Sequence, residues 1–151
     1  MYLAEALAER AEAQARLAQL HTRLHNNAQI QEGDAPTEDP AALLAEAEGL
    51  LERIDQLVRA INATNVATRL GSETLADALA RRTTLLKRRQ LYAELADAAS
   101  ARQDRYSRSE IKYVPTLDVA ALRAQADQAA KEFRILDSKI QQANWLTEMV
   151  D

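Results

Sequence analysis

The clearest metal-binding spacing in the chain is a pair of histidines, His21 and His25, which stand four residues apart. On a helix this spacing places both imidazoles on one face, where they can share a metal ion. A zinc site needs three or four ligands that are themselves held by hydrogen bonds, and here only an acidic loop further along the chain can add one. We therefore interpret the histidines as a solvated surface pair, and the sequence predicts no metal and no other cofactor.

The rest of the chain carries no recognisable catalytic arrangement. It has no cysteine, which excludes a disulfide, a thiolate metal site and a cysteine nucleophile. There is no Ser-His-Asp order, no Gly-rich phosphate loop and no His-Glu-x-x-His motif, and the Glu-x-x-His pairs of di-iron bundles are also absent. We therefore expect a protein that is not an enzyme and has no evident small-molecule substrate.

The strongest binding candidate is a basic and aromatic loop at residues 102–113. Its arginines flank hydroxyl groups and can hold an anion, while the same residues can latch onto the acidic loop at residues 31–39 of a neighbouring subunit. We favour the latch, and the residues assigned to this binding site or interface are Arg102, Arg105, Tyr106, Arg108, Glu110, Lys112, Glu32, Asp34 and Glu38.

A polar cluster is expected at the opposite end of the helices, formed by Asn62, Asn65, Asn144 and Trp145. Asparagine is unfavourable inside a helix, so Asn62 and Asn65 need a structural reason to be there. We favour hydrogen bonding to Trp145, to the chain end or to a loop; a polar ligand pocket is the alternative.

Basic residues are concentrated between Arg81 and Arg89, and most of them are predicted to lie on a salt-bridged surface. Arg82 and Arg89 are exceptions because they occupy positions of the apolar stripe set by the leucines around them. A lone buried charge is very costly. If these two arginines are buried they therefore need acidic partners, for which Asp55 and Asp137 are candidates.

Four segments with helical periodicity must position these residues, at about 2–30, 40–70, 74–102 and 117–145. Their apolar residues recur at alternating steps of three and four, which predicts helices. In the second segment a further apolar line runs beside the main stripe, and so wide a stripe suits a helix bundle better than a two-stranded coiled coil. This second line consists of Leu44, Leu51 and Val58.

Helix starts are marked by capping residues. Asp39 followed by Pro40 reads as an N-cap and first helical position, because the carboxylate accepts a free backbone N–H and proline lacks one. Thr74 followed by Asp77 is typical of a capping box, and Gly71 is a natural helix stop.

Together these elements predict one all-α domain over residues 1–151. It is an antiparallel four-helix bundle, or two long helical hairpins with coiled-coil-like packing that close their cores only on meeting another copy. The connectivity is expected to bring the acidic and basic loops to one end. Short links and few glycines and prolines argue against a sheet fold.

Charge and hydropathy exclude several classes of protein. The formal net charge of −4 gives no overall attraction to nucleic acid, and acidic residues are interleaved in every segment. The longest apolar runs are far below the roughly 18 residues that a membrane helix needs, and the first residues lack the pattern of a secretory signal. We expect a cytoplasmic protein without a membrane span.

Four segments carry a resemblance to a known family: residues 31–33, 61–65, 103–112 and 143–145. Together they resemble a family of small bacterial all-helical proteins of unassigned function, some of whose members are labelled septicolysin. The resemblance extends over essentially the whole chain and implies a soluble helical protein, with no catalytic residues to carry over. The label implies a cytolysin.

These observations favour a non-enzymatic, self-associating helical bundle, a homo-oligomer that acts as a scaffold or interaction module. The alternative is anion or nucleic-acid binding through residues 102–113. A membrane-active cytolysin, as the family label implies, is a minor alternative.

Overall fold

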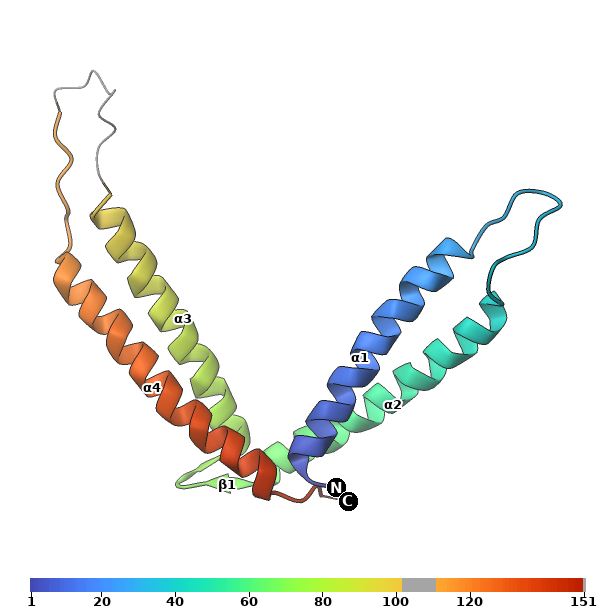
Figure 1. Ribbon diagram of the computed structural model, residues 1–151. Coiled ribbons are helices and arrows are strands. Elements are labelled where there is room, and N and C mark those ends of the chain that lie inside the picture. The colour runs from blue at the N-terminus through green and yellow to red at the C-terminus, as the bar shows by residue number, and fades with distance from the viewer. Residues whose placement is uncertain (102–110, 151) are drawn as a thin grey trace. The chain divides into compact units, whose positions relative to one another are not determined.

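A computed structural model describes residues 1–101 and 111–150 of the chain. Apart from one pair of two-residue strands, its regular elements are helices, which confirms the all-α prediction (Figure 1). In chain order the elements are α1 (Leu3–Asn26), α2 (Pro40–Ala67), β1 (Arg69–Leu70), β2 (Glu73–Thr74), α3 (Leu75–Ala99) and α4 (Val119–Leu146).

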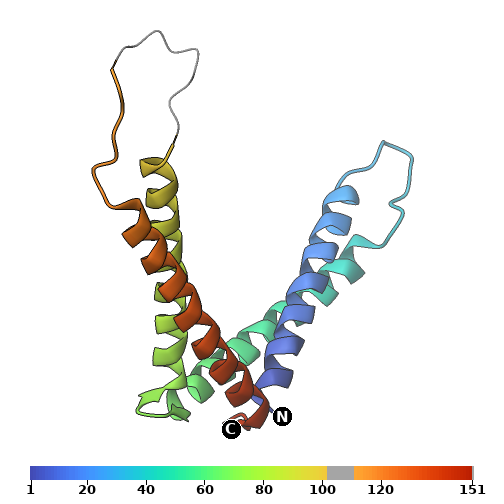
Figure 2. The ribbon, with the colours of Figure 1, turned by 60° about the vertical axis from the view of Figure 1, so that its left-hand side comes forward.

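The chain divides into two compact units. The N-terminal unit comprises Met1–Arg69 and Gln142–Asp151, and the central unit comprises Leu70–Gln141. Figures 1 and 2 both show α1 beside α2 and α3 beside α4. Each unit is therefore built on a hairpin of two antiparallel helices.

The helix ends follow the predicted capping chemistry. The Asp39 carboxylate accepts a hydrogen bond from the backbone N–H of Ala41 at 3.0 Å, directly before α2. At the start of α3 the Thr74 hydroxyl accepts from the backbone N–H of Asp77 at 3.1 Å, and the Asp77 carboxylate accepts from the N–H of Thr74 at 3.2 Å. Gly71 has a φ of +65°, which lets the chain turn sharply between β1 and β2.

α1 ends at Asn26, four residues before the predicted end of the first segment. The next residue, Asn27, is buried, and its side-chain amide donates to the carbonyl oxygen of Arg23 at 2.9 Å. An asparagine that satisfies a free carbonyl of the last turn stops a helix without a glycine. The chain then turns at Gly33, whose φ is +91°.

Each hairpin buries one stripe of small and branched apolar residues. In the N-terminal unit a core cluster of Leu20, Leu43 and Ala47 is packed against the partly buried Leu17, Leu24 and Leu50. The central unit buries a corresponding set at steps of three and four, formed by Leu75, Ala78, Leu85, Ala96, Leu122, Ala126, Ala129, Leu136 and Ile140. The core of each unit therefore lies between its two helices.

The two hairpins are also copies of one another in sequence. Residues 3–10 read LAEALAER and residues 75–82 read LADALARR; residues 36–47 read PTEDPAALLAEA and residues 115–126 read PTLDVAALRAQA. Thus α1 corresponds to α3 and α2 to α4, with seven more residues between the two matched stretches in the second hairpin. The ends correspond as well, because the antiparallel pairing of β1 with β2 has its counterpart in the antiparallel bridge between Tyr2 and Glu148.

Candidate functional site

Five of the predicted loop residues lie outside the described residues: Arg102, Arg105, Tyr106, Arg108 and Glu110. Lys112 is described and is exposed. The latch between the basic loop and an acidic loop therefore stays a prediction.

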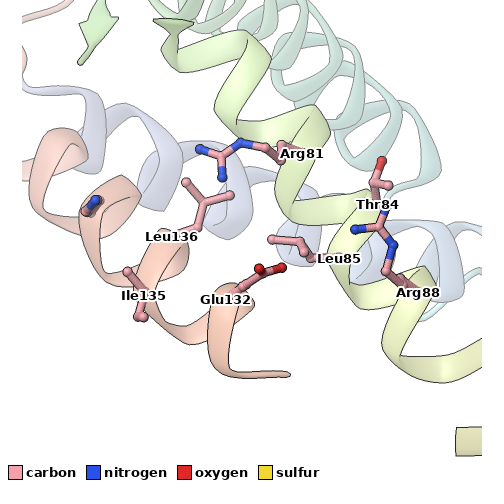
Figure 3. Close-up of a pocket in the computed structure, with 8 residues that line it drawn as sticks. Arg81, Thr84, Leu85, Arg88, Glu132, Ile135 and Leu136 are labelled. Atoms are coloured by element: carbon pink, nitrogen blue, oxygen red, sulfur yellow. The ribbon is translucent and has the colours of Figure 1, made fainter. Parts of the chain in front are cut away.

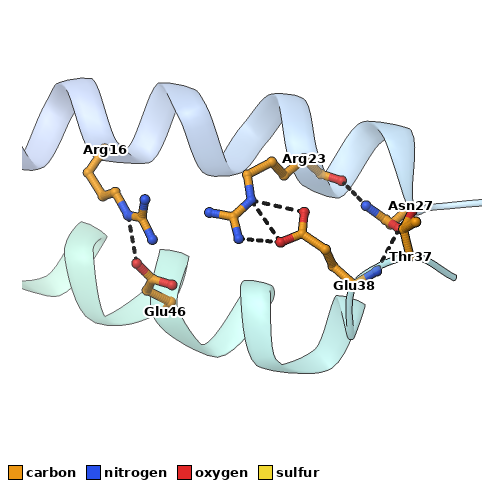
Figure 4. Close-up of polar contacts among 6 residues, drawn as sticks. All are labelled: Arg16, Arg23, Asn27, Thr37, Glu38 and Glu46. Carbon is orange, nitrogen blue, oxygen red and sulfur yellow. Dashed lines mark hydrogen bonds and ion pairs between the residues drawn. The ribbon is translucent and has the colours of Figure 1, made fainter.

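Glu38 of the acidic loop forms an ion pair within its own hairpin. The Nε of Arg23 donates to both carboxylate oxygens of Glu38, at 3.0 and 3.1 Å (Figure 4). This hydrogen bonding holds the pKa of Glu38 below its ordinary value of 4.5. The side-chain oxygen of Asn27 accepts from the Thr37 hydroxyl at 3.1 Å and from the backbone N–H of Glu38 at 3.2 Å. Thr37 and Glu38, which precede the Asp39 cap of α2, are therefore held by Arg23 of α1 and by Asn27 at its C-terminal end.

Glu32 and Asp34 lie nearer the turn of the same loop. Both side chains are exposed. The backbone N–H of Asp34 donates to the carbonyl oxygen of Gln31 at 3.0 Å, so a local turn fixes the backbone there. Of the three acidic residues predicted for the interface, these two present carboxylates to solvent.

At the predicted polar end, the central group is Thr64, which the sequence analysis did not single out. It is fully buried, and its hydroxyl donates to the carbonyl oxygen of Ala60 at 2.8 Å and accepts from the backbone N–H of Val150 at 3.1 Å. Thr64 thereby ties the C-terminal segment onto α2 within the N-terminal unit. A threonine on the core stripe between two asparagines was the available signal.

The four residues predicted for the polar end differ in exposure. Asn144 is buried and Asn65 is half-buried, while Asn62 and Trp145 are exposed. The hydrogen bonding to Trp145 and the alternative ligand pocket both stay predictions.

Ion pairs close one flank of the N-terminal hairpin, here called flank A. Arg53 of α2 donates to the Glu9 carboxylate at 2.6 and 2.9 Å, and Arg16 of α1 donates to Glu46 at 2.8 Å. With the Arg23–Glu38 pair, three bridges follow one another along the hairpin, two of them drawn in Figure 4. The hydrogen bond from Arg53 holds the pKa of Glu9 below its ordinary value of 4.5.

In the described part of the central unit, no such bridges lie on flank A. The repeat aligns the three ion pairs with Arg81 and Glu132, Arg88 and Gln125, and Leu95 and Leu117. Among the described residues no ion pair joins α3 to α4 at these positions. Arg81 instead donates to Glu73, and that hydrogen bond raises the pKa of the guanidinium.

An open groove of about 440 Å³ occupies this flank of the central unit. Side chains of α3 and α4 face each other across it, with Arg81 and Leu85 on one side and Glu132 and Leu136 on the other (Figure 3). We call it the cationic groove, because its lining carries three cations and one acid. The lining residues are Arg81, Arg88, Lys139, Glu132, Thr84, Leu85, Ile135 and Leu136.

The opposite flank of each hairpin is here called flank B. On this flank it is the central unit whose two helices are joined by ion pairs. Arg82 of α3 donates to Asp137 of α4 at 2.7 Å, which confirms one of the two partners proposed from the sequence. The other, Asp55, pairs with Arg59 in its own helix. Arg89 lies exposed rather than in the core.

A second bridge on flank B of the central unit joins Arg123 of α4 to Asp97 of α3 at 3.3 Å. Arg123 also donates to the hydroxyl of Ser100 at 3.3 Å. Flank B of the central unit is therefore held at two points along its length.

Flank B of the N-terminal unit is apolar instead. The repeat aligns Asp137 with Val58 and Arg123 with Leu44. Arg10, the counterpart of Arg82, thus loses its acidic partner, and its buried Nε has no hydrogen-bond partner among the described residues. The second apolar line of α2 runs here, with Leu44 and Leu51 exposed over 53% and 47% of their surface.

The two histidines lie at the end of flank B. Together with Leu24, Pro40 and Leu44, His21 and His25 line a shallow, largely apolar hollow. Within residues 1–101 and 111–150 no group of three or more His, Cys, Asp or Glu side chains is placed to hold a metal ion.

Comparison with known proteins places the chain in a family. Residues 10–149 match the model of a family of unknown function, DUF6847. The chain belongs to this family. A solved structure of high similarity is that of a functionally unknown conserved protein from Corynebacterium diphtheriae, which is 56% identical over 99% of each chain, with a TM-score of 0.93. No curated protein matches the chain.

For this DUF6847 protein the residues that differ between its two hairpins are therefore the best guide to function. Several core positions carry the same residue in both repeats, such as Leu43 and Leu122, whereas the flanks have exchanged ion pairs for apolar or cationic surface. Among the described helices none is long and apolar enough to cross a membrane.

Proposed function

We propose that this DUF6847 protein is a non-enzymatic, self-associating helical interaction module of the bacterial cytoplasm. The observation that carries the proposal is the apolar line on α2. Leu44 and Leu51 stand two helical turns apart, beside the buried stripe, and about half of each side chain meets solvent. A regular apolar line on a charged helix is typical of a surface that another helix covers.

The composition of the line supports a protein partner over a small ligand. Leucines at a spacing of seven pack into the grooves of a neighbouring helix. They offer no polar group that would orient a small molecule. Covering the line removes apolar surface from water, which is the main driving force of association between proteins.

Sedimentation velocity over a range of micromolar concentrations tests this proposal. The wild-type chain is expected to show a concentration-dependent species larger than a monomer. Leu51→Glu is expected to shift it toward monomer while the helical circular dichroism signal stays unchanged. Ala45→Glu adds the same charge to the exposed outer face of α2 and serves as the matched control. A wild-type chain that is strictly monomeric throughout would contradict the proposal.

Anion or nucleic-acid binding is the second candidate, and the cationic groove is the observation that favours it. Arg88 and Lys139 line this groove and form no ion pair among the described residues. Binding of RNA or DNA by such cations weakens steeply with salt. Gel retardation at low and high salt tests it, and the absence of a complex at low salt would end this alternative.

Neither the family description nor that of the Corynebacterium protein mentions a cytolysin. Rupture of membranes therefore forms no part of the proposed function.

A further inference from the structure

We propose that self-association pairs unlike hairpins: flank B of the N-terminal unit of one copy docks into the cationic groove of the central unit of a second copy. This inference rests on the proposed function and specifies its contact. It follows from the way in which the two repeats differ.

The two repeats differ in which flank carries ion pairs between the helices. Flank A is bridged in the N-terminal unit and open in the central unit, whereas flank B is bridged in the central unit and open in the N-terminal unit. Each unit therefore offers one surface free of cross-helix ion pairs. The two free surfaces are on different flanks and carry different chemistry, so they are suited to each other rather than to their own kind.

The two hairpins also differ in their balance of acidic and basic side chains. Residues 1–69 contain eleven acidic and six basic side chains, whereas residues 70–141 contain ten acidic and thirteen basic ones. Two hairpins of the same type would repel each other at short range, whereas unlike hairpins attract. The overall charge of the chain conceals this difference between its halves.

Acidic side chains lie beside the apolar line of α2. Glu48 and Asp55 each follow a leucine of the line by four residues, so they form an acidic row one step further round α2. In the groove, Arg88 and Lys139 stand beside Ile135, which is exposed over half of its surface. In the proposed contact, the apolar line and acidic row of one copy therefore meet the apolar residues and cations of the groove in the other copy.

The spacings match as well. Glu48 and Asp55 are seven residues apart on α2, and Arg81 and Arg88 are seven residues apart on α3. At 1.5 Å per residue each pair spans about 10.5 Å along its helix axis. Two acidic groups can thus meet two basic groups when the helices run nearly side by side, with Asp55 and Arg81 exchanging their present partners Arg59 and Glu73.

An apolar floor also distinguishes this partner from a nucleic acid. Leu85 and Leu136 are buried at the base of the groove, and Ile135 is half covered. A phosphate backbone would engage the cations but would leave the isoleucine without an apolar partner. A leucine-bearing acidic helix satisfies both. In a dimer with two-fold symmetry the contact forms twice, once in each direction.

A charge-swap experiment on the full chain tests the pairing. Glu48→Lys with Asp55→Lys reverses the acidic row, and Arg88→Glu with Lys139→Glu reverses the groove. Each pair of changes alone should raise the dissociation constant of the assembly by about tenfold or more in sedimentation at low salt. The chain with all four changes should return to within about threefold of wild type, because opposite charges face each other again.

The controls separate this contact from folding and from the proposed function. All variants should keep the wild-type circular dichroism spectrum, since the four side chains are exposed. If the wild type associates but the four-fold variant stays as weak as the two-fold variants, the pairing of unlike hairpins is wrong while self-association stands. If the wild type does not associate at all, the proposed function is itself wrong.

Discussion

The two hairpins of this protein share part of their core and differ in their flanks. At several buried positions the repeats carry the same residue, such as Leu43 and Leu122 or Ile61 and Ile140. On flank A the Glu9–Arg53 bridge of the N-terminal unit corresponds to Arg81 and Glu132, which have exchanged charge and no longer bridge the helices. The comparison shows which positions a helical hairpin must keep and which it can change.

The physical reason is the difference in energy between the two kinds of position. A buried leucine contributes several kcal/mol, about 2–5 on truncation to alanine. An exposed ion pair contributes about 0–1 kcal/mol. After duplication, ion pairs on a flank can therefore be lost or reversed at little cost in stability, and the freed surface becomes available for binding.

The largest expected effect comes from truncating the shared core. Leu57 and Leu136 are repeat counterparts, and each is only 3% exposed. Changing either to alanine should lower the free energy of unfolding of its own unit by about 2–5 kcal/mol. Hydrogen exchange resolved by residue measures this unit by unit. A cost below about 1 kcal/mol in one unit only would show that the two cores are not equivalent.

A smaller effect is expected at a position where the repeats differ, Thr64 and its counterpart Ala143. Thr64→Val removes the hydroxyl that holds the backbone N–H of Val150, and should cost about 1–2 kcal/mol. The Val150 amide should lose its protection from hydrogen exchange. Thr64→Ser keeps the hydroxyl and should retain most of that protection. Equal loss in both variants would contradict the assigned role of the hydroxyl.

The two arginines on the core stripes should respond in opposite directions. Arg10→Met should raise the free energy of unfolding by roughly 1 kcal/mol, because it removes a buried Nε that has no partner among the described residues. Arg82→Met should lower it by roughly 1 kcal/mol, because it leaves Asp137 without its partner. Chemical denaturation checks both. If both variants changed the free energy of unfolding in the same direction, the proposed difference between the two flanks would be wrong.

The sequence predicted the elements of this fold well and its flanks poorly. Periodicity located all four helices, and local capping chemistry located the starts at Asp39 and Thr74, because both signals lie within a few residues of each other. Asp137 was one of the candidate partners of Arg82 and Arg89, because a buried charge needs a partner, but the sequence left open which of these residues meet. Periodicity and capping depend on residues close together in the sequence, and a buried charge must be paired whatever the fold.

The remaining features depend on the register between helices. Whether Arg53 meets Glu9 or another acidic residue depends on how α2 slides along α1, which periodicity alone leaves open. The internal repeat was missed although it is visible in the sequence, where the stretches PTEDPAAL and PTLDVAAL stand in equivalent places. The repeat aligns Arg10 with Arg82 and Val58 with Asp137, so it places a valine where the acidic partner of Arg10 would stand.

The smallest expected effect is a difference in acid sensitivity. Arginine hydrogen bonds lower the pKa of Glu9 and Glu38 in the folded N-terminal unit. Their contribution to stability is therefore complete above the ordinary pKa of 4.5 and is lost as the pH falls through the lowered values. Glu9→Gln with Glu38→Gln should flatten the pH dependence of α1 and α2 protection below about pH 4.5. An unchanged pH profile would show that these bridges contribute nothing.

The pairing of unlike hairpins is tested most directly by mixing two chains, each blocked on a different surface. Leu51→Glu blocks the apolar line, Ile135→Glu blocks the cationic groove, and Gln56→Glu, the repeat counterpart of Ile135, is the control. Each blocked chain should sediment as a monomer at a concentration where wild type and control associate. An equimolar mixture should recover a dimer, because one intact line then meets one intact groove. A mixture that stays monomeric, while the wild type associates, would contradict the account.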